Sequence, residues 1–184
     1  NAQPTRMISF DNVRVPQANR LGAEGQGFAI AMEGLDGGRI NIATCSIGTA
    51  QQALEEATAY VQERKQFNTA IAEFQAVQFK LADMLTELVA ARQMVRLAAS
   101  KLDKKDSQAS TYCAMAKRFA TDVGFNVCND ALQLFGGYGY IKEYPMERHV
   151  RDSRVHQILE GTNEIMRVIV SRRLLMEGAL EQIK

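Results

Sequence analysis

Glu160 is the residue of this sequence whose surroundings best suit acid–base chemistry. An arginine-rich run leads down to Glu160, Gly161 permits a turn, and Thr162 is a favourable N-cap for the apolar-periodic run that begins at Ile165. The apolar pair just before Glu160 keeps water away from a carboxylate and favours its protonated form, which makes a glutamate a useful base near neutral pH. The alternative is an ordinary first-turn acid stabilised by the helix dipole, and these residues alone favour that second interpretation.

Three other stretches contain charged residues, glycines or both, the residue types that suit a ligand site. Asp36-Gly37-Gly38-Arg39 places two glycines inside a helical pattern, at about 1 kcal/mol each relative to alanine, so either a kink or a function needs the space. Arg64 is either a cation for a pyrophosphate or a cation near a helix C-terminus that needs no ligand. Gly136-Gly137 either admits a ligand to the backbone or stops a helix, and spacing alone favours the helix stop.

The two histidines give little support to hydrolysis or zinc chemistry. His149 and His156 lack the spacing of metal ligands, and no serine–histidine–acid constellation is apparent. We therefore expect no metal site. We interpret His156 as a satisfied, half-buried histidine whose ring bonds a neighbouring helix.

Apolar residues recur with alternating gaps of four and three residues along three long runs, as in the buried seams of packed helices. The first helix is expected from Phe28 to about Glu63 and the second over 77–102, with a polar connection over 66–72. The three seams are Ala43, Ile47, Ala50, Leu54, Ala57 and Val61, then Val77, Leu81, Met84, Leu88, Ala91, Val95, Ala98 and Leu102, then Cys113, Ala116, Ala120, Val123, Val127 and Leu134.

Turn and cap residues delimit the other elements. Ser107 is the predicted N-cap of the third helix, Gly136-Gly137 its end, and Pro145 the first residue of a short fourth helix. The last helix is expected from Ile165 to near Glu177. Three long seams joined by short connections, plus a final helix, predict an all-α, antiparallel up-and-down four-helix bundle with additional short helices.

The composition argues against several classes of partner. The 184 residues include 22 Lys and Arg and 21 Asp and Glu, a net charge of +1, so no overall field favours nucleic acid or an anionic membrane. No apolar run is long enough to span a bilayer. Cys45, Cys113 and Cys128 lack metal spacing and predict reduced, packed thiols in a reducing compartment. The first residue, Asn1, hints at a processed chain or an excised fragment.

Four ordered sequence blocks resemble the flavin-dependent acyl-CoA dehydrogenases, and the resemblance covers essentially the whole chain. The blocks are Glu63-Arg64-Lys65-Gln66-Phe67, then Phe74-Gln75-Ala76-Val77-Gln78, then Ala131-Leu132-Gln133-Leu134-Phe135-Gly136-Gly137-Tyr138-Gly139, and then Glu160-Gly161-Thr162 preceded by Arg151-Asp152 and His156-Gln157-Ile158. Together they are a specific signal where any one would be weak. The sequence over 38–42 and 138–160 is most similar to the family members that act on short branched-chain substrates, of the isobutyryl-CoA dehydrogenase type.

The resemblance implies a role for each matching residue. It implies that Glu160 is the catalytic base and that Asp36 and Arg39 line the acyl-CoA site. The residues it implies for the flavin nucleotide are Arg64, Gln66, Phe67 and Gln75, touching the flavin of a neighbouring subunit, Gln133, Gly136 and Gly137 along its adenine end, and Thr162 and Glu164 against the flavin of the other protomer.

The resemblance also implies a reaction and partners. Glu160 would remove the α-proton of a short branched-chain acyl-CoA, FAD would accept the β-hydride, and an electron-transfer flavoprotein would be the oxidant. A homotetramer (a dimer of dimers) in the bacterial cytoplasm or the mitochondrial matrix is implied. The alternatives are a non-catalytic helical oligomerisation module and an acyl-CoA oxidase, which uses the same base.

The sequence departs from the family in two respects. Asn68 stands where the family generally has glycine, although asparagine tolerates left-handed backbone, and Thr69-Ala70 replaces a common basic–proline pair. Only the C-terminal part of the family's architecture is covered. Residues 1–22, with strand-like pieces at 7–15 around a turn, match the tail of a β-rich middle domain, and 23–184 the helical domain. We therefore expect this chain alone to be inactive.

Overall fold

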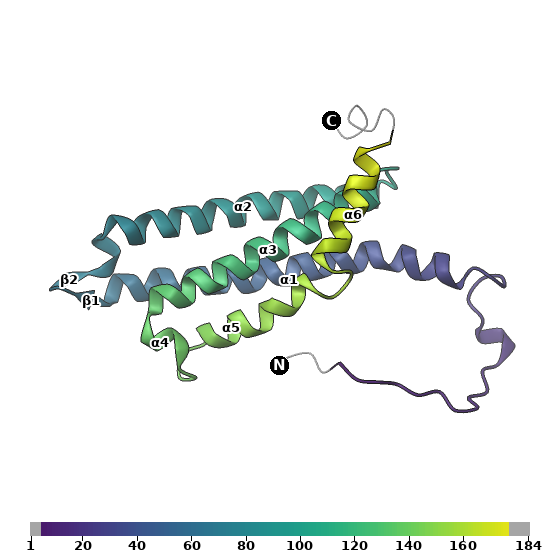
Figure 1. The fold of residues 1–184 in the computed structure, drawn as a ribbon, viewed down its shortest axis with the longest axis horizontal. Helices are drawn as coiled ribbons and strands as arrows, with labels where there is room; N and C mark the ends of the chain where they lie inside the picture. Colours follow the sequence, from purple (N-terminus) through teal and green to yellow (C-terminus); the bar gives the residue numbers. More distant parts are fainter. Residues whose placement is uncertain (1–4, 177–184) are drawn as a thin grey trace.

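Three long helices lie side by side in the computed structural model, which describes residues 5–176, and each runs antiparallel to the one before it in the chain (Figure 1). They are α1 (Gly27–Glu63), α2 (Gln75–Asp103) and α3 (Ala109–Phe135). All six seam residues predicted for α1 are buried, and those of α2 and α3 form the hydrophobic core or pack against it, except Val77 at the start of α2, which is half-buried outside the core. The predicted seams are therefore confirmed, because a four–three repeat places its members on one face of a helix.

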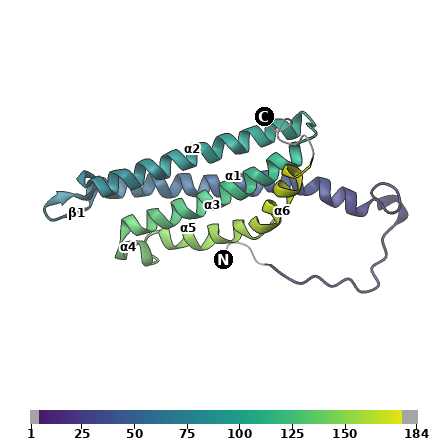
Figure 2. The same cartoon turned by 45° about the horizontal axis from the view of Figure 1, so that its top comes forward.

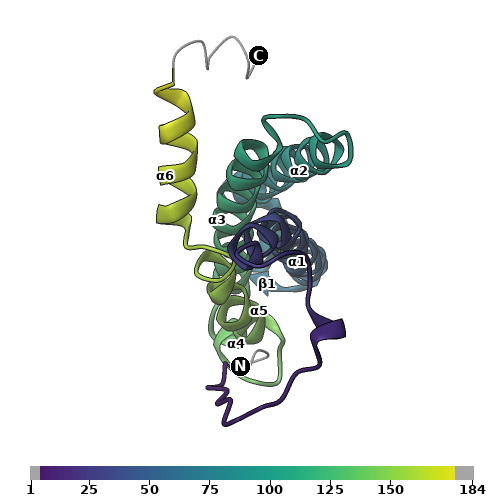
Figure 3. The same ribbon diagram turned by 90° about the vertical axis from the view of Figure 1, so that its right-hand side faces the viewer.

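The shorter helices complete the bundle on one side of α3. After α4 (Gly137–Tyr140), α5 (Met146–Ser153) packs against α1 and α3 in the fourth position (Figures 1 and 2). A 3₁₀ turn, η3 (Arg154–Gln157), then leads to α6 (Asn163–Leu174), which packs on α3 and crosses the bundle instead of following its axis (Figure 3). The all-α bundle with additional short helices is thus confirmed.

A short β-hairpin, with two residues in each strand and two in the turn, connects α1 and α2. Strand β1 (Lys65–Gln66) pairs with β2 (Thr69–Ala70), with Gln66 opposite Thr69, and a 3₁₀ turn, η2 (Ile71–Glu73), follows. Both turn residues are left-handed, Phe67 at φ +52° and Asn68 at φ +61°, as a type I′ hairpin turn requires. The expectation that Asn68 preserves this turn in place of glycine is confirmed.

Residues 5–26 lie away from the helices, with one 3₁₀ turn, η1 (Gln17–Asn19) (Figure 1). The strand-like pieces predicted within 7–15 form no strand, because every residue of this segment is exposed and no partner strand lies beside it. The turn is present, with Asn12 at φ +49°. Assignment of 1–22 to a β-rich domain stays a prediction, and residues 1–4 lie outside the described part, as does Glu177.

Three local predictions need correction. Ser107 does not cap α3, because the helix begins one residue later than predicted: Gln108 holds the N-cap position without a side-chain cap, and its backbone N–H donates to Asp106 Oδ1 at 2.8 Å. Pro145 is the N-cap of α5, one position before the first helical residue. Cys45 is exposed, whereas the other two thiols are packed; burial raises the pKa of Cys113 to about 11 and of Cys128 to about 12. All three are free, as predicted.

Small residues bring α1 and α3 into close contact. At Gly124 an added Cβ would lie 3.0 Å from the backbone oxygen of Ser46 and would overlap its hydroxyl. Near the far end of α3, Tyr60 stacks on Phe135 with ring centroids 4.0 Å apart, and Tyr144 packs edge-on against both rings. None of the helices in residues 5–176 is long and apolar enough to cross a membrane.

We expect Gly124→Ala to destabilise the chain and Gly48→Ala to stabilise it. The first substitution forces a methyl group into the α1–α3 contact, which costs about 1–3 kcal/mol. The second adds a methyl group with no atom within 4 Å, and removing a helical glycine gains about 0.5–1 kcal/mol. Urea unfolding of the two purified variants measures both changes. Equal stabilisation by both substitutions would contradict close packing at Gly124.

Candidate active site

Glu160 occupies a strained turn between η3 and α6. Its φ is +57°, a left-handed conformation that costs a residue with a side chain about 1–2 kcal/mol, and Gly161 follows at φ +90°. Thr162 then caps α6, its hydroxyl oxygen accepting from the backbone N–H of Ile165 at 3.4 Å. The predicted N-cap and helix start are confirmed. The turn places the Glu160 side chain away from the path of α6.

The carboxylate of Glu160 packs against α1 at Gly38. A Cβ added at Gly38 would lie 2.8 Å from the carboxyl carbon of Glu160 and would overlap one of its oxygens. By contrast, a Cβ at Gly37 would meet nothing within 4 Å. Helix α1 runs through Asp36–Arg39 without interruption, so these glycines do not separate two helices. The space that the sequence reserves at Gly38 is filled by the carboxylate.

Asp36 and Arg39 lie on either side of Gly38 and pair with each other. Arg39 Nη1 donates to Asp36 Oδ1 at 2.5 Å, and the Ser110 hydroxyl donates to the same oxygen at 3.1 Å. The Arg39 residue is only 7% exposed, and its Nε has no hydrogen-bond partner within residues 5–176. The structure therefore brings the predicted substrate residues and the predicted base to one short segment of α1.

Lys117, which the sequence analysis assigned no role, supports the Glu160 turn from α3. Its Nζ donates to the carbonyl oxygen of Gly161 and to Asn163 Oδ1, both at 2.8 Å. Burial lowers the pKa of Lys117 to about 8. The sequence did contain a signal for this residue. Lys117 lies between Ala116 and Ala120 of the third apolar seam, and a charged residue is unusual on a buried helix face.

His156 lies in η3 and is buried, but its environment differs from the prediction. Its Nδ1 has no hydrogen-bond partner within residues 5–176, so the expectation of a satisfied ring is wrong. Burial, reinforced by the positive charge of Lys117, lowers the pKa of His156. Both effects favour the neutral imidazole.

A second group of predicted residues lines a cleft of about 530 Å³ where α1, the hairpin and the end of α3 meet. Its lining includes five residues predicted to touch the flavin nucleotide, namely Arg64, Gln66, Gln133, Gly136 and Gly137. The Arg64 guanidinium lies over the Tyr138 ring, 5.4 Å from its centroid. Gly136, at φ +59°, ends α3 as predicted.

This cleft suits a nucleotide. A guanidinium can pair with a pyrophosphate, amide side chains can bond a base or ribose, and aromatic rings give an apolar wall. A glycine pair leaves room for a ligand to reach the backbone. The residues present therefore fit a nucleotide cofactor.

The other four residues predicted for the flavin do not line the cleft. Phe67, at the hairpin tip, is 89% exposed, and Gln75 is exposed at the start of α2. Thr162 and Glu164 lie beside the Glu160 turn, where hydrogen bonds from its own backbone N–H and from the Thr162 hydroxyl lower the pKa of Glu164. Within residues 5–176, no three His, Cys, Asp or Glu side chains form a group that could hold a metal ion.

Comparisons with known proteins identify relatives of this chain. Residues 25–175 match the family model of the acyl-CoA dehydrogenase C-terminal domain. A mitochondrial isobutyryl-CoA dehydrogenase of Dictyostelium discoideum is 59% identical over 174 residues, which are 95% of this chain and 42% of that protein. The chain thus spans less than half the length of this curated relative.

Solved structures have the same fold. Butyryl-CoA dehydrogenase from Megasphaera elsdenii matches with a TM-score of 0.88 and 46% identity over 91% of this chain and 43% of its own. A chain from a structure described as the electron transferring flavoprotein of Acidaminococcus fermentans matches with a TM-score of 0.89 and 49% identity, over 91% of this chain and 44% of that one. With the family model covering most of its length, the chain belongs to the acyl-CoA dehydrogenase family and comprises its C-terminal domain.

Proposed function

We propose that this chain is the base-carrying part of an FAD-dependent dehydrogenase that converts a short, branched acyl-CoA to its 2-enoyl-CoA. The observation that carries the proposal is the Glu160 carboxylate lying against Gly38, in the same short segment of α1 that carries the Asp36–Arg39 ion pair. The carboxylate is a proton-accepting group on a turn whose backbone is left-handed at Glu160 and Gly161. The kinship with isobutyryl-CoA dehydrogenase supports the choice of substrate class.

Glu160 acts as the general base in this proposal. Its carboxylate takes the proton from the α-carbon of the thioester, a hydride leaves the β-carbon, and a C=C double bond forms between the two carbons. When bound, FAD supplies the acceptor for the hydride, a two-electron reduction. The Asp36–Arg39 pair fixes the wall of α1 opposite the carboxylate and lines the acyl-CoA site.

The cleft at the other end of α3 would bind the nucleotide part of FAD. Arg64 would pair with a phosphate, Gln66 and Gln133 would donate or accept hydrogen bonds, and Gly136-Gly137 would admit the ligand to the backbone. Phe67 and Gln75 would add contacts from the rim. Thr162 and Glu164, near Glu160, would contact the flavin of another protomer.

We further propose that the full-length protein is a homotetramer and passes electrons to an electron-transfer flavoprotein, in a bacterial cytoplasm or a mitochondrial matrix. Exposed apolar side chains along α2, among them Phe79, Leu85 and Leu97, support assembly, because such patches mark interaction surfaces. The match to a chain described with an electron transferring flavoprotein supports the electron partner. The isolated chain would be inactive, since the rest of the acyl and flavin sites would come from other segments.

Replacing Glu160 by Gln in the full-length protein should abolish dehydrogenation and leave flavin binding intact. The amide is nearly isosteric but cannot take a proton, and a general base contributes about 10²–10⁴ in rate. Stopped-flow absorbance of the flavin after mixing with isobutyryl-CoA gives the rate. Glu147→Gln, which alters an exposed ion pair with Arg151, is the matched control. Unchanged turnover in E160Q would remove the proposed mechanism.

Gly38→Ala should slow the same reaction by displacing the Glu160 carboxylate. A shift of about 1 Å in a reacting group can cost about 10²-fold in rate, and a methyl group at Gly38 overlaps the carboxylate. Gly34→Ala, on the same helix with nothing within 4 Å, is the control and should keep the wild-type rate. Equal rates for both variants would show that the contact at Gly38 does not position the base.

Arg64→Ala in the full-length protein should weaken FAD binding by about tenfold or more, since a charge-assisted hydrogen bond contributes about 1.5–3 kcal/mol. Titration of the apoprotein, followed by the loss of free FAD fluorescence, measures the dissociation constant. Lys65→Ala removes the neighbouring cation, which is exposed and does not line the cleft. If K65A weakens binding as much as R64A, the effect comes from overall charge and the cleft is not the nucleotide site.

A further inference from the structure

Lys117 is a buried cation that the proposed mechanism does not use. It lies on the inner face of α3 and is 0% exposed, although lysine is almost never fully buried without a partner. A buried ammonium must recover its lost hydration through hydrogen bonds. Those bonds identify what the residue does.

The hydrogen bonds of Lys117 go to the turn that carries Glu160. One is to the backbone carbonyl of Gly161, the residue directly after Glu160, and the other is to the side-chain oxygen of Asn163, the first residue of α6. Both acceptors are neutral oxygens, and among residues 5–176 no carboxylate pairs with the ammonium. A single side chain thus holds the Gly161–Thr162 peptide, the second after Glu160, and the start of the next helix.

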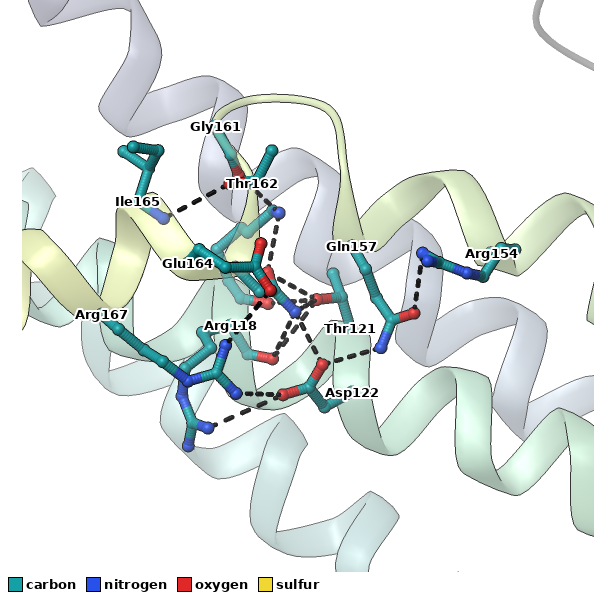
Figure 4. A network of polar contacts seen from close by, with 12 residues as sticks. Arg118, Thr121, Asp122, Arg154, Gln157, Gly161, Thr162, Glu164, Ile165 and Arg167 are labelled. Carbon is teal, nitrogen blue, oxygen red and sulfur yellow. Dashed lines mark hydrogen bonds and ion pairs between the residues drawn. The ribbon is translucent and has the colours of Figure 1, made fainter.

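Asn163 extends this support across three elements. It is 3% exposed, and its amide nitrogen donates to Thr121 Oγ1 at 2.9 Å and to Asp122 Oδ1 at 2.7 Å. Asp122 also accepts from Gln157 Nε2 of η3 at 2.7 Å, so the segment before Glu160 is tied to the same carboxylate (Figure 4). Hydrogen bonds to α3 therefore hold the chain both before the turn, at Gln157, and after it, at Asn163.

The strain of the turn explains why it needs this support. Glu160 and Gly161 are both left-handed, and a residue held in a sparsely populated conformation keeps it only where the surroundings over-determine it. The hydrogen bond from Lys117 to the Gly161 carbonyl fixes the orientation of that peptide. Since the direction of the Glu160 side chain follows from its backbone, the same bond aims the carboxylate at Gly38.

Charged groups from every neighbouring element face Lys117. They are Arg39 of α1, Asp122 of α3, His156 of η3, Glu160 of the turn and Glu164 of α6. Burial is the main cause of its lowered pKa, and the acids oppose the effect. The ammonium therefore also places a positive charge close to the predicted base.

We propose that Lys117 is a positioning residue for the base, which holds the Glu160–Gly161 turn in its left-handed form and so keeps the carboxylate against Gly38. This inference rests on the proposed function of Glu160. It assigns to Lys117 no contact with substrate or cofactor. Its loss should therefore slow proton removal and leave acyl-CoA binding nearly unchanged.

The test uses Lys117→Met in the full-length protein with FAD bound, because methionine has a similar length and no donor. The exchange of the substrate's α-protons with solvent deuterium, followed by NMR, reports the base without requiring oxidation. We expect this exchange to slow by about tenfold or more, with the acyl-CoA dissociation constant within about threefold. Amide hydrogen exchange of residues 158–163 should become faster. Lys80→Met, which removes a more exposed ion pair with Asp130, should change neither measurement.

Each outcome bears on the assignment. Wild-type α-proton exchange in K117M would overturn it. If K117M fails to fold, Asn163→Ala keeps the ammonium but removes one acceptor, and unchanged exchange at both the α-carbon and residues 158–163 would overturn it instead. If the wild-type protein exchanges no α-protons, or exchanges them equally in E160Q, the proposed function itself fails. If α-proton exchange is lost in E160Q but unchanged in K117M, only the proposed role of Lys117 is contradicted.

Discussion

The close contact between α1 and α3 is the constraint on which the other parts of the structure depend. It exists because Gly124 presents no side chain to Ser46 and because alanines occupy much of both buried faces. Helix α3 also packs against α2, α5 and α6 and contacts α4, so it is the central helix of the bundle. Helix α3 contributes to both candidate sites: Lys117 holds the Glu160 turn, and the glycines at the end of the helix line the cleft.

Apolar packing and polar contacts have different roles around Glu160. Packing brings α6 near α3, but it is not directional and would tolerate a small rotation or shift of the helix. Hydrogen bonds from Asn163 and Gln157 to Asp122 are directional, and Arg118 and Arg167 complete the surroundings of that carboxylate at 3.6 and 3.5 Å. The start of α6 is therefore fixed by polar groups, as an accurately placed base requires.

The sequence predicted those features that local periodicity and turn chemistry control. Burial follows directly from a four–three repeat, so the three seams were confirmed, and the cap at Thr162 depends only on neighbours in sequence. The prediction of Ser107 as N-cap was wrong because α3 begins at Ala109, so the N-cap position falls on Gln108. Lys117 was missed because its partners lie 44 and 46 residues away, and no local pattern records such a pairing. The cleft was reached only through family resemblance, since Arg64 and Gly136 belong to different helices.

The separation of the two sites constrains how the protein can work. With a rise of 1.5 Å per residue, Lys117 and Gly136 lie roughly 28 Å apart along α3. Under the proposed function, the nucleotide cleft of one chain and its catalytic turn would therefore serve different parts of a flavin, or different flavins. A second protomer then has to bring the complementary parts, and assembly becomes a condition for catalysis. The same rigid helix that separates the sites within one chain would set the spacing of the two flavins in the oligomer.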